Sequence, residues 1–512
     1  MPRRSTPWLR FAVVLAAVGV PAQAGDRAQW GERHSRNMVS GEKGLPASFD
    51  PKTGKNVKWA VPLGSETYSS PVVASGRVFI GTNNQRPRDP RHQGDRGVLL
   101  CLDERDGRLL WQLVVPKLED DPYLDWPRSG ICSPPTIEGD RVYAMTNRCE
   151  AACLDIHGMA NGNDGPYKDE GSHMALRGKP PMKPGTLDAD ILWLFDLVGQ
   201  AGVYPHDATH CSPLLHGRFL YLNTSTGVDN THRRNRAPEA PSLVVLEKAT
   251  GRYLARDGER IGPLIYHSTW SSPALGDVGG RPLVFFGGGD GVVYAFEALR
   301  ALPPAREVLT LTRAWRFDCD PTAPKSDIHR YKRNREVGPS NIKSMPVFHK
   351  GRVYVTVGGD VWWGKAKAWL KCIDASKSGD VTASAERWSY PLRRHCCSTP
   401  AIHDGLVFVG DCGRTVHCVD AETGKPCWTH QTRGHIWASP LVADGKVYVA
   451  TRRGELWTFA ASRQKQVLGR VALRSPISAS PVAANGVLYV ATHSRLYAAH
   501  RSGGGAPAVG GR

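Results

Sequence analysis

The chain has 512 residues, of which 41% are hydrophobic and 22% are charged, and its net charge is +18. This apolar content is sufficient for a large packed core and excludes a chain that is disordered throughout. After the first 24 residues, no apolar stretch approaches the ~18 residues that a membrane-spanning helix needs. A polytopic membrane protein is therefore excluded.

Residues 1–24 have the pattern of an export signal. Three arginines stand among the first ten residues, the next ten residues are apolar, and Ala22, Gln23 and Ala24 form a small-residue cleavage site before Gly25. The apolar stretch is too short to span a bilayer, so we expect a cleaved signal peptide rather than an uncleaved anchor. The mature protein is then periplasmic or secreted and has no transmembrane segment.

A Ser-Pro motif or a near variant, followed by two short apolar runs around a turn, recurs along the chain. SSPVVASGRVFIGT begins at Ser69, STPAIHDGLVFVGD at Ser398 and ASPVAANGVLYVAT at Ala479. Each copy is typical of a β-hairpin, because a glycine-containing turn separates two β-prone runs and the proline stands where a missing N–H costs least. The eight copies have their prolines at positions 71, 134, 213, 273, 346, 400, 440 and 481.

A third strand, a turn and a fourth strand follow the hairpin in most copies. CLDERDGRLLW ends at Trp111 and CVDAETGKPCW ends at Trp428. Similar tryptophans stand at 193, 315 and 388, and their regular placement favours packing between neighbouring sheets over stacking against a ligand. Four antiparallel strands of this kind make one blade of a β-propeller.

The two ends of the repeat region complement each other. The eighth copy stops after three strands, near Leu496, and an additional strand with Trp59 precedes the first copy. The sequence therefore predicts an all-β, eight-bladed propeller of four-stranded antiparallel blades over residues 56–501, in which the N-terminal strand completes the last blade. Residues 25–55 are expected to form an N-terminal extension and residues 502–512 a disordered Gly-rich tail.

The blade pattern Asp-x-x-Thr/Asp-Gly-x-x-x-Trp resembles that of the pyrroloquinoline-quinone (PQQ) type propellers, and the resemblance covers roughly residues 56–501. That superfamily includes quinoprotein alcohol dehydrogenases and the non-catalytic propeller of the outer-membrane protein assembly machinery. The repeat indicates the fold specifically, but it says little about activity because it marks blade packing rather than a site.

Residues just before each innermost strand of a propeller lie around the axis on one face, so we expect them to converge. Most of them are Cys or His, which bind soft or borderline metals, and two are Trp. The metal candidates are Cys132, His210, Cys211, His267, His395 and His435. The cofactor candidates are Trp270, Lys343, Cys396, Cys397 and Trp437, and Asn341 completes the set.

A structural interpretation of the same residues remains open. Cysteine often packs as a small hydrophobe, the histidines could hydrogen-bond carbonyl groups, and some of the twelve cysteines could form disulfides in an oxidising compartment. The adjacent Cys396 and Cys397 resemble the vicinal pair that contacts the quinone in quinoprotein dehydrogenases. That resemblance makes PQQ and calcium candidate cofactors, but the family's calcium ligands and catalytic aspartate have no clear counterparts, and only Asp360 and Asp411 follow second strands suitably.

A polar insertion offers a separate set of possible calcium ligands. Asn161, Asn163, Asp164, Asp169 and Glu170 supply oxygen atoms. The glycine spacing does not match the helical calcium loop, and an ordinary polar surface loop is the favoured interpretation.

Two functional classes follow. The first is a non-catalytic binding or scaffold protein of the cell envelope, which complete blade packing favours. The alternative is a PQQ- or metal-dependent oxidoreductase with its site in the axial funnel. The basic charge could attract an acidic polysaccharide, an anionic membrane or nucleic acid, but the basic residues rarely cluster. Because the basic residues rarely cluster, we expect no specific binding of nucleic acid. We expect a monomer, whose partners are envelope proteins or an acidic polysaccharide.

Overall fold

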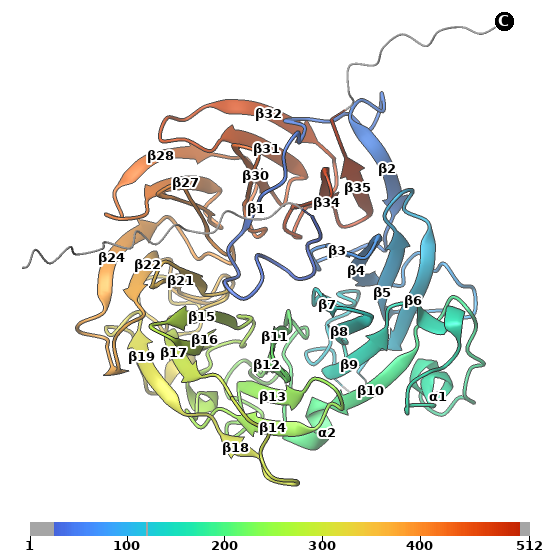
Figure 1. Cartoon of the computed structure of the whole chain (residues 1–512). Helices are drawn as coiled ribbons and strands as arrows, with labels where there is room; N and C mark the ends of the chain where they lie inside the picture. Colours follow the sequence, from blue (N-terminus) through green and yellow to red (C-terminus); the bar gives the residue numbers. More distant parts are fainter. Residues whose placement is uncertain (1–24, 119–120, 502–512) are drawn as a thin grey trace, which may run out of the picture.

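The computed structural model describes residues 25–118 and 121–501, and the expected signal peptide and Gly-rich tail lie outside these residues. Eight sheets surround a central axis in chain order (Figure 1). From the axis outward, the first blade contains β3 (Val72–Ala74), β4 (Arg77–Asn83), β5 (Arg96–Asp103) and β6 (Leu109–Pro116), and the second contains β7 (Thr136–Glu138), β8 (Arg141–Met145), β9 (Glu150–Asp155) and β10 (Ile191–Asp196). The third blade contains β11 (Leu214–His216), β12 (Phe219–Asn223), β13 (Leu243–Glu247) and β14 (Tyr253–Arg256), and the fourth contains β15 (Ala274–Val278), β16 (Arg281–Gly287), β17 (Val292–Glu297) and β19 (Arg313–Asp318).

The second half repeats this arrangement. The fifth blade contains β20 (Val347–His349), β21 (Arg352–Gly358), β22 (Ala368–Asp374) and β24 (Glu386–Leu392), and the sixth contains β25 (Ala401–His403), β26 (Leu406–Gly410), β27 (Thr415–Asp420) and β28 (Pro426–Gln431). The seventh blade contains β29 (Leu441–Ala443), β30 (Lys446–Ala450), β31 (Glu455–Ala460) and β32 (Val467–Ala472), and the eighth contains β33 (Val482–Ala484), β34 (Val487–Ala491), β35 (Arg495–Ala499) and β2 (Val57–Pro62). The eighth blade confirms the predicted closure, because β2 pairs antiparallel with β35 and Trp59 lies opposite Ala498.

Short additional elements decorate the blades. The two-residue strands β1 (Val39–Ser40), β18 (Leu309–Thr310) and β23 (Gly379–Asp380) pair in parallel with β29, β14 and β19, so three blades have five strands instead of the expected four. The helices are α1 (Glu170–Met174) and α2 (Leu197–Ala201), with 3-10 turns η1 (Gly158–Asn161), η2 (Gly262–Leu264) and η3 (Ile328–Tyr331). The α-helices of the described chain have five residues each, and none could traverse a bilayer.

The core consists of apolar layers between successive blades. Among the described residues, eight hydrophobic clusters each join the facing sides of two neighbouring blades, including the last and the first. The fourth-strand tryptophans belong to these layers, as the sequence predicts. In six of them the indole Nε1 donates to a backbone carbonyl of the next blade: Trp59, Trp111, Trp193, Trp315, Trp388 and Trp428.

The glycine in the turn after the third strand leaves room for the fourth-strand tryptophan of the preceding blade. Gly424 has a φ of +71°, and a Cβ atom there would meet the Trp388 ring at 2.7 Å. Any larger residue would be strained and would also displace the ring.

The Ser-Pro motifs link the blades around the axis. The backbone N–H of Thr399 donates to Ser439 Oγ, that of Ser439 to Ser480 Oγ, and that of Ser480 to Ser70 Oγ. The last bond joins the eighth blade to the first. At these positions the hydroxyl before the proline has a structural role, because it satisfies a buried N–H of the adjacent blade.

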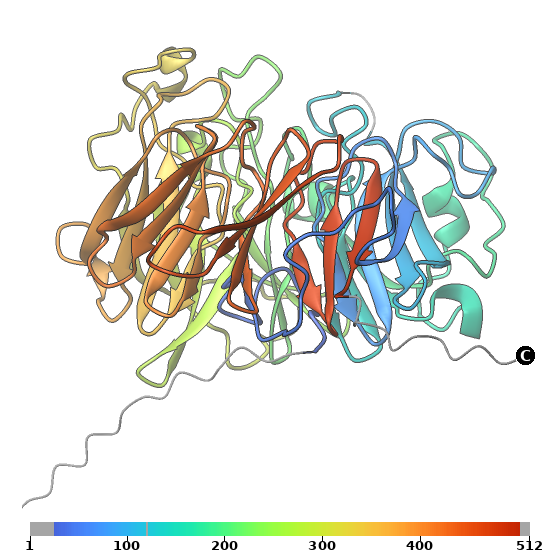
Figure 2. The same cartoon turned by 90° about the horizontal axis from the view of Figure 1, so that it is seen from above.

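Residues 27–40 cross one face of the propeller and contact all eight blades. This segment passes over the centre in Figure 1 and lies opposite the long loops of the other face in Figure 2. It reaches the innermost strands in blade order, through hydrogen bonds with Val73, Ile137, Leu215, Leu275, Phe348, Ile402, Val442 and Ala483. We call residues 27–40 the axial plug.

A buried arginine fixes the axial plug to the blades. Arg36 is 0% exposed, and its guanidinium donates to the carbonyl oxygens of Trp30, Ser212, Pro213 and Pro273 and to Ser212 Oγ. Burial lowers the pKa of Arg36 to about 10. Its charge is stabilised by carbonyl dipoles, and the plug closes this end of the axis.

Candidate functional site

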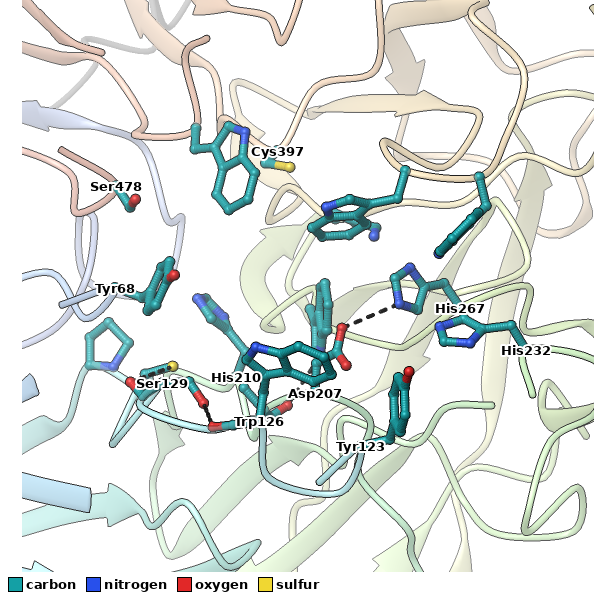
Figure 3. A pocket seen from close by; sticks show the side chains of 18 of the residues that line it. Tyr68, Tyr123, Trp126, Ser129, Asp207, His210, His232, His267, Cys397 and Ser478 are labelled. Atoms are coloured by element: carbon teal, nitrogen blue, oxygen red, sulfur yellow. Dashed lines mark hydrogen bonds and ion pairs between the residues drawn. The ribbon is translucent and has the colours of Figure 1, made fainter. Parts of the chain in front are cut away.

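A cavity of about 550 Å³ lies on the axis, above the axial plug (Figure 3). Trp30 of the plug lines it. The other walls come from residues that precede innermost strands and from long loops between strands, such as those carrying Tyr123, His232 and Lys332. The expected convergence of residues distant in sequence is therefore present.

Seven of the eleven metal and cofactor candidates that the sequence suggests line this cavity. They are Cys132, His210, His267, Trp270, Lys343, Cys397 and Trp437. Cys211, His395, Cys396 and His435 do not line it. Neighbours in an extended chain point to opposite sides, so where His210 and Cys397 face the cavity, Cys211 and Cys396 face away from it.

The four remaining residues have other surroundings. The Cys396 thiol donates to the carbonyl of Gly410 at 3.0 Å, and Cys211 is fully buried in an apolar layer between blades. His395 is buried beside Cys397, and His435 is exposed with its Nδ1 against the carbonyl of Cys412. All twelve cysteines are free thiols in the structure.

Aromatic side chains form most of the cavity wall. Five blades and the plug contribute them: Trp30, Tyr68, Tyr123, Trp126, Trp270, Trp362, Trp363 and Trp437. Trp362 stands edge-on to Trp270 and to Trp437, with ring centroids 6.0 and 5.8 Å apart. Flat rings that lack a stacked partner offer faces to a flat ligand.

Lys343 lies between two of these rings. Its Nζ is 4.5 Å from the centroids of both Trp270 and Trp362, and it pairs with Asp360 Oδ2 at 2.8 Å. Other cations lie against the walls, with Lys332 Nζ 4.8 Å from the Trp363 centroid and the Arg452 guanidinium 4.2 Å from that of Trp437. Cation–π contacts of this kind hold the positive charges next to the cavity.

Asp360 connects Lys343 with a histidine. Its Oδ2 also accepts from His267 Nδ1 at 2.8 Å, and its Oδ1 accepts the backbone N–H groups of Trp362 and Trp363. Burial opposes the charge of Asp360, but Lys343 and His267 hold its pKa well below the usual value. Burial likewise opposes protonation of His267, yet the Asp360 carboxylate outweighs it and raises the pKa of this imidazole.

Three histidines meet at one side of the cavity. The Nε2 atoms of His206 and His232 are 3.2 Å apart, and suitable ligand atoms of His206, His232 and His267 all lie within 4.8 Å of one another. Asp207 completes the group, with Oδ1 3.6 Å from His206 Nε2 and Oδ2 3.5 Å from His267 Nε2. Burial lowers the pKa of His206 to about 3, with a further contribution from the neighbouring imidazoles.

Only His267 of this group is among the metal candidates that the sequence suggests. The six suggested ligands do not form one compact set in the structure, because Cys132, His210 and His267 line the cavity and the other three do not. His206 and His232 come from loops without a repeat motif, as do Tyr123, Trp362 and Trp363. The one available signal was the unusual loop Thr224–His232, which interrupts the hairpin pattern of its blade.

Calcium-bound PQQ, which the resemblance suggests, does not match the residues of the cavity. Ca²⁺ takes six to eight oxygen ligands, and Asp207 is the single carboxylate that lines the cavity within the described part of the chain. Asp360 already accepts four hydrogen bonds, and Asp411 accepts from the backbone of Arg393 and Thr415 and lies 3.0 Å from His417 Nε2. The aromatic walls suit a flat ring system, but the polar groups do not suit calcium.

The polar insertion does not gather calcium ligands either. Asn161 donates to Asp164, Asn163 donates to Glu170, and Lys168 donates to the side chain and carbonyl of Asn163. These oxygens already accept hydrogen bonds from nitrogen donors, as in an ordinary polar loop.

Solved structures with the same architecture include catalytic and non-catalytic proteins. A europium-containing methanol dehydrogenase matches 93% of this chain and 98% of its own, with a TM-score of 0.57. The quinohemoprotein alcohol dehydrogenase of Comamonas testosteroni matches 95% and 82% with a TM-score of 0.56, and BamB of Moraxella catarrhalis matches 87% and 98% with a TM-score of 0.51. Each is 11% identical to this chain, so these similarities show the fold alone.

Among curated proteins, no sequence matches this chain. A family model does match, over residues 31–163 and 312–506, which is more than half of the chain. His206, Asp207, His232 and His267 all lie between the two matched stretches. The chain belongs to the family described as outer membrane protein assembly factor BamB, within the PQQ-like β-propellers.

Proposed function

We propose that this chain is a β-propeller of the cell envelope that binds a flat, unsaturated organic anion in its axial cavity. The observation that carries the proposal is Lys343, held between Trp270 and Trp362 in a cavity walled by aromatic rings. A propeller that acted only as a scaffold would have no need for a buried ion pair and unstacked rings at its centre. An apolar cavity with a few converging polar groups is the usual form of a small-molecule site.

The charges around the cavity favour an anion. Lys332 and Lys343 line it and Arg452 supports its wall, and Asp207 is the lining carboxylate among the described residues. Asp360 compensates the charge of Lys343, so the excess positive charge comes from Lys332 and Arg452. The cations lie against ring faces, so a flat ligand that stacks on these rings would bring its negative groups beside them. Stacking supplies affinity, and the cations select the charge.

Location in the periplasm or secretion is part of the proposal. The pattern of residues 1–24 and the description of the matched family both support it. Neither of these two observations depends on the cavity, so the proposal of export stands or falls independently of the proposal of ligand binding.

A scaffold without a small-molecule ligand is the second candidate function, and the family match favours it. The two candidates differ in what the cavity does. Ligand binding requires the rings at the axis, whereas a scaffold would present an outer surface to its partner and would tolerate changes inside the cavity.

Quenching of tryptophan fluorescence tests the proposal. The probes are PQQ without added metal, a naphthoquinone sulfonate and an uncharged naphthoquinone of the same ring size. We expect the two anions to bind more tightly than the uncharged ring. Trp126→Ala at the cavity mouth should weaken binding about tenfold, equivalent to about 1.4 kcal/mol.

The control is Trp369→Ala. Trp369 is partly buried outside the cavity, near Lys371, and its loss should leave probe affinity unchanged. Equal weakening by the two variants, or no binding of any probe by the folded protein, would favour the scaffold.

A further inference from the structure

We propose that His206, His232 and His267, together with Asp207, bind a divalent transition-metal ion at the side of the axial cavity. The inference goes beyond the proposed function, because the site needs no organic ligand. His232, His267 and Asp207 line the cavity, so a bound ion would have an open side toward it (Figure 3).

The separations of the ligand atoms suit one small ion. With metal–ligand bonds of about 2.0–2.2 Å, adjacent ligands of a tetrahedral ion lie about 3.3 Å apart. The His206 and His232 Nε2 atoms are 3.2 Å apart, and the Asp207 oxygens are 3.6 and 3.5 Å from the Nε2 atoms of His206 and His267. These three separations suit one ion, and because the histidine ligand atoms are spread over up to 4.8 Å, the rings would draw together on binding it.

Each imidazole is fixed through its other nitrogen. Nδ1 of His206 lies 2.8 Å from the carbonyl of Val228, and Nδ1 of His232 lies 3.4 Å from that of Asn230. His267 Nδ1 bonds to the buried Asp360 carboxylate. Metal-binding histidines usually donate their second N–H to a carbonyl or a carboxylate, which orients the ring and leaves the opposite nitrogen for the metal.

The Nε2 atoms have few partners in the protein. A carbonyl oxygen only accepts, so Nδ1 of His206 carries the proton in its 2.8 Å bond to Val228, and Nε2 of His206 presents a lone pair. Nε2 of His232 lies 3.2 Å from this atom, and a metal ion would take the place of this contact between the two imidazoles. His267 is 1% exposed, and its Nε2 has no hydrogen-bond partner. A cation among the three nitrogens satisfies all of them.

The backbone holds Asp207 in place. Its φ is +60°, and its N–H and C=O bond to the carbonyl of Tyr123 and the N–H of Trp126, both at 2.6 Å. The Tyr123 ring also stacks on His206, with centroids 6.0 Å apart. The loop of His206 and Asp207 is therefore braced by the loop of Tyr123 and Trp126, and two further loops supply His232 and His267.

A second cluster of possible metal ligands in the described chain differs from this one, because cations of the protein already pair with its carboxylates. Asp89, His92 and Asp188 also approach one another, but Arg91 pairs with both carboxylates. Their charge is already compensated by the protein. Around His206, His232 and Asp207 no arginine or lysine forms an equivalent pair within the described residues.

The ligand set indicates the class of metal. Three imidazoles and one carboxylate suit Zn²⁺, Cu²⁺, Fe²⁺ or Ni²⁺, whereas Ca²⁺ and Mg²⁺ prefer oxygen ligands. We therefore expect Zn²⁺ and Co²⁺ to bind at one equivalent, with no competition from a large excess of Mg²⁺.

The experiment uses full-length mature protein without a histidine tag, stripped with EDTA and then dialysed. Binding of ZnCl₂ is measured by calorimetry, and CoCl₂ is followed by its visible d–d absorption, whose intensity distinguishes a four-coordinate protein site from the hydrated ion. His206→Ala and His232→Gln should weaken binding by more than about a hundredfold, above the 10–100-fold cost of losing an outer-shell partner. His435→Ala removes an exposed histidine outside the cluster and should leave the affinity unchanged.

His232→Gln keeps the result interpretable if His206→Ala fails to fold, because His232 lies on a loop at the cavity and Gln preserves a polar side chain. Circular dichroism establishes that each variant is folded. A folded wild-type protein that binds no Zn²⁺ or Co²⁺, or equal affinities for His232→Gln and His435→Ala, would overturn the proposal. The quinone probes are tested without metal, so either proposal can fail without the other.

Discussion

Replacing Arg36 with methionine tests whether the axial plug stabilises the propeller. The substitution removes the donors to four carbonyl groups, those of Trp30, Ser212, Pro213 and Pro273, and roughly preserves the length of the side chain. Each buried acceptor left without a partner costs about 1–3 kcal/mol. Entry of water and the removal of a buried charge offset part of this cost.

We therefore expect Arg36→Met to lower the free energy of unfolding by about 3–5 kcal/mol, the range found when one partner of a buried charged group is removed. Guanidinium and thermal unfolding measure this change. Trp30 lines the cavity and its carbonyl accepts a hydrogen bond from Arg36, so the same variant should also weaken binding of the quinone probes.

Arg33→Met is the matched control. Arg33 lies in the same plug, but its side chain is 70% exposed and its contact with Glu138 is 3.4 Å long. A surface pair of this kind contributes about 0–1 kcal/mol. If Arg36→Met and Arg33→Met have the same stability, the plug merely rests on the blades and the reasoning is refuted.

Two further predictions concern pH and thiol reactivity. Burial lowers the pKa values of His210 and His493 to about 4. Between pH ~6.5 and about 4, these groups are therefore neutral in the folded state but take up protons in the unfolded state. The free energy of unfolding should fall over this range by roughly 1.4 kcal/mol per pH unit for each group. His493→Gln should reduce that slope by one proton in urea titrations, and an unchanged slope would contradict the assignment. The neighbouring Cys412 thiol and His395 ring lower the pKa of the half-buried Cys397 thiol, so iodoacetamide should label Cys397 first in the reduced protein, as mass spectrometry would show. Slower labelling of Cys397 than of the buried thiols would contradict this prediction.

The fold could be predicted because the same short sequence motif recurs in each of the eight blades. The hydroxyl residue before most of the prolines, the turn glycine and the fourth-strand tryptophan of six blades recur because neighbouring blades have the same N–H groups to satisfy and the same wedge to fill. Trp59 was assigned to the last blade on this basis, and its pairing opposite Ala498 follows from the same repeat.

The axial plug could not be predicted in the same way. Its residues have no repeat, and Arg36 is stabilised by backbone carbonyls whose positions exist only after the blades have closed. A lone arginine in a polar segment gives no sign in the sequence that it will be fully buried.

The cavity was only partly predictable, for a related reason. Residues before the innermost strands are placed by the repeat, so Trp270, Lys343 and Cys397 could be nominated. Residues of insertions, such as His206 and His232, are placed by tertiary contacts between loops. Their approach to within 3.2 Å has no counterpart in sequence spacing.

Anomalous diffraction from crystals of the metal-free protein soaked in CoCl₂, recorded at the cobalt absorption edge, tests the central claim most directly. The claim is that loops of different origin converge on the axis to form a binding site. One strong anomalous peak among the Nε2 atoms of His206, His232 and His267, facing a cavity walled by Trp270 and Trp362, is the predicted result. Cobalt bound only elsewhere on the surface, or these three rings turned away from one another, would contradict it.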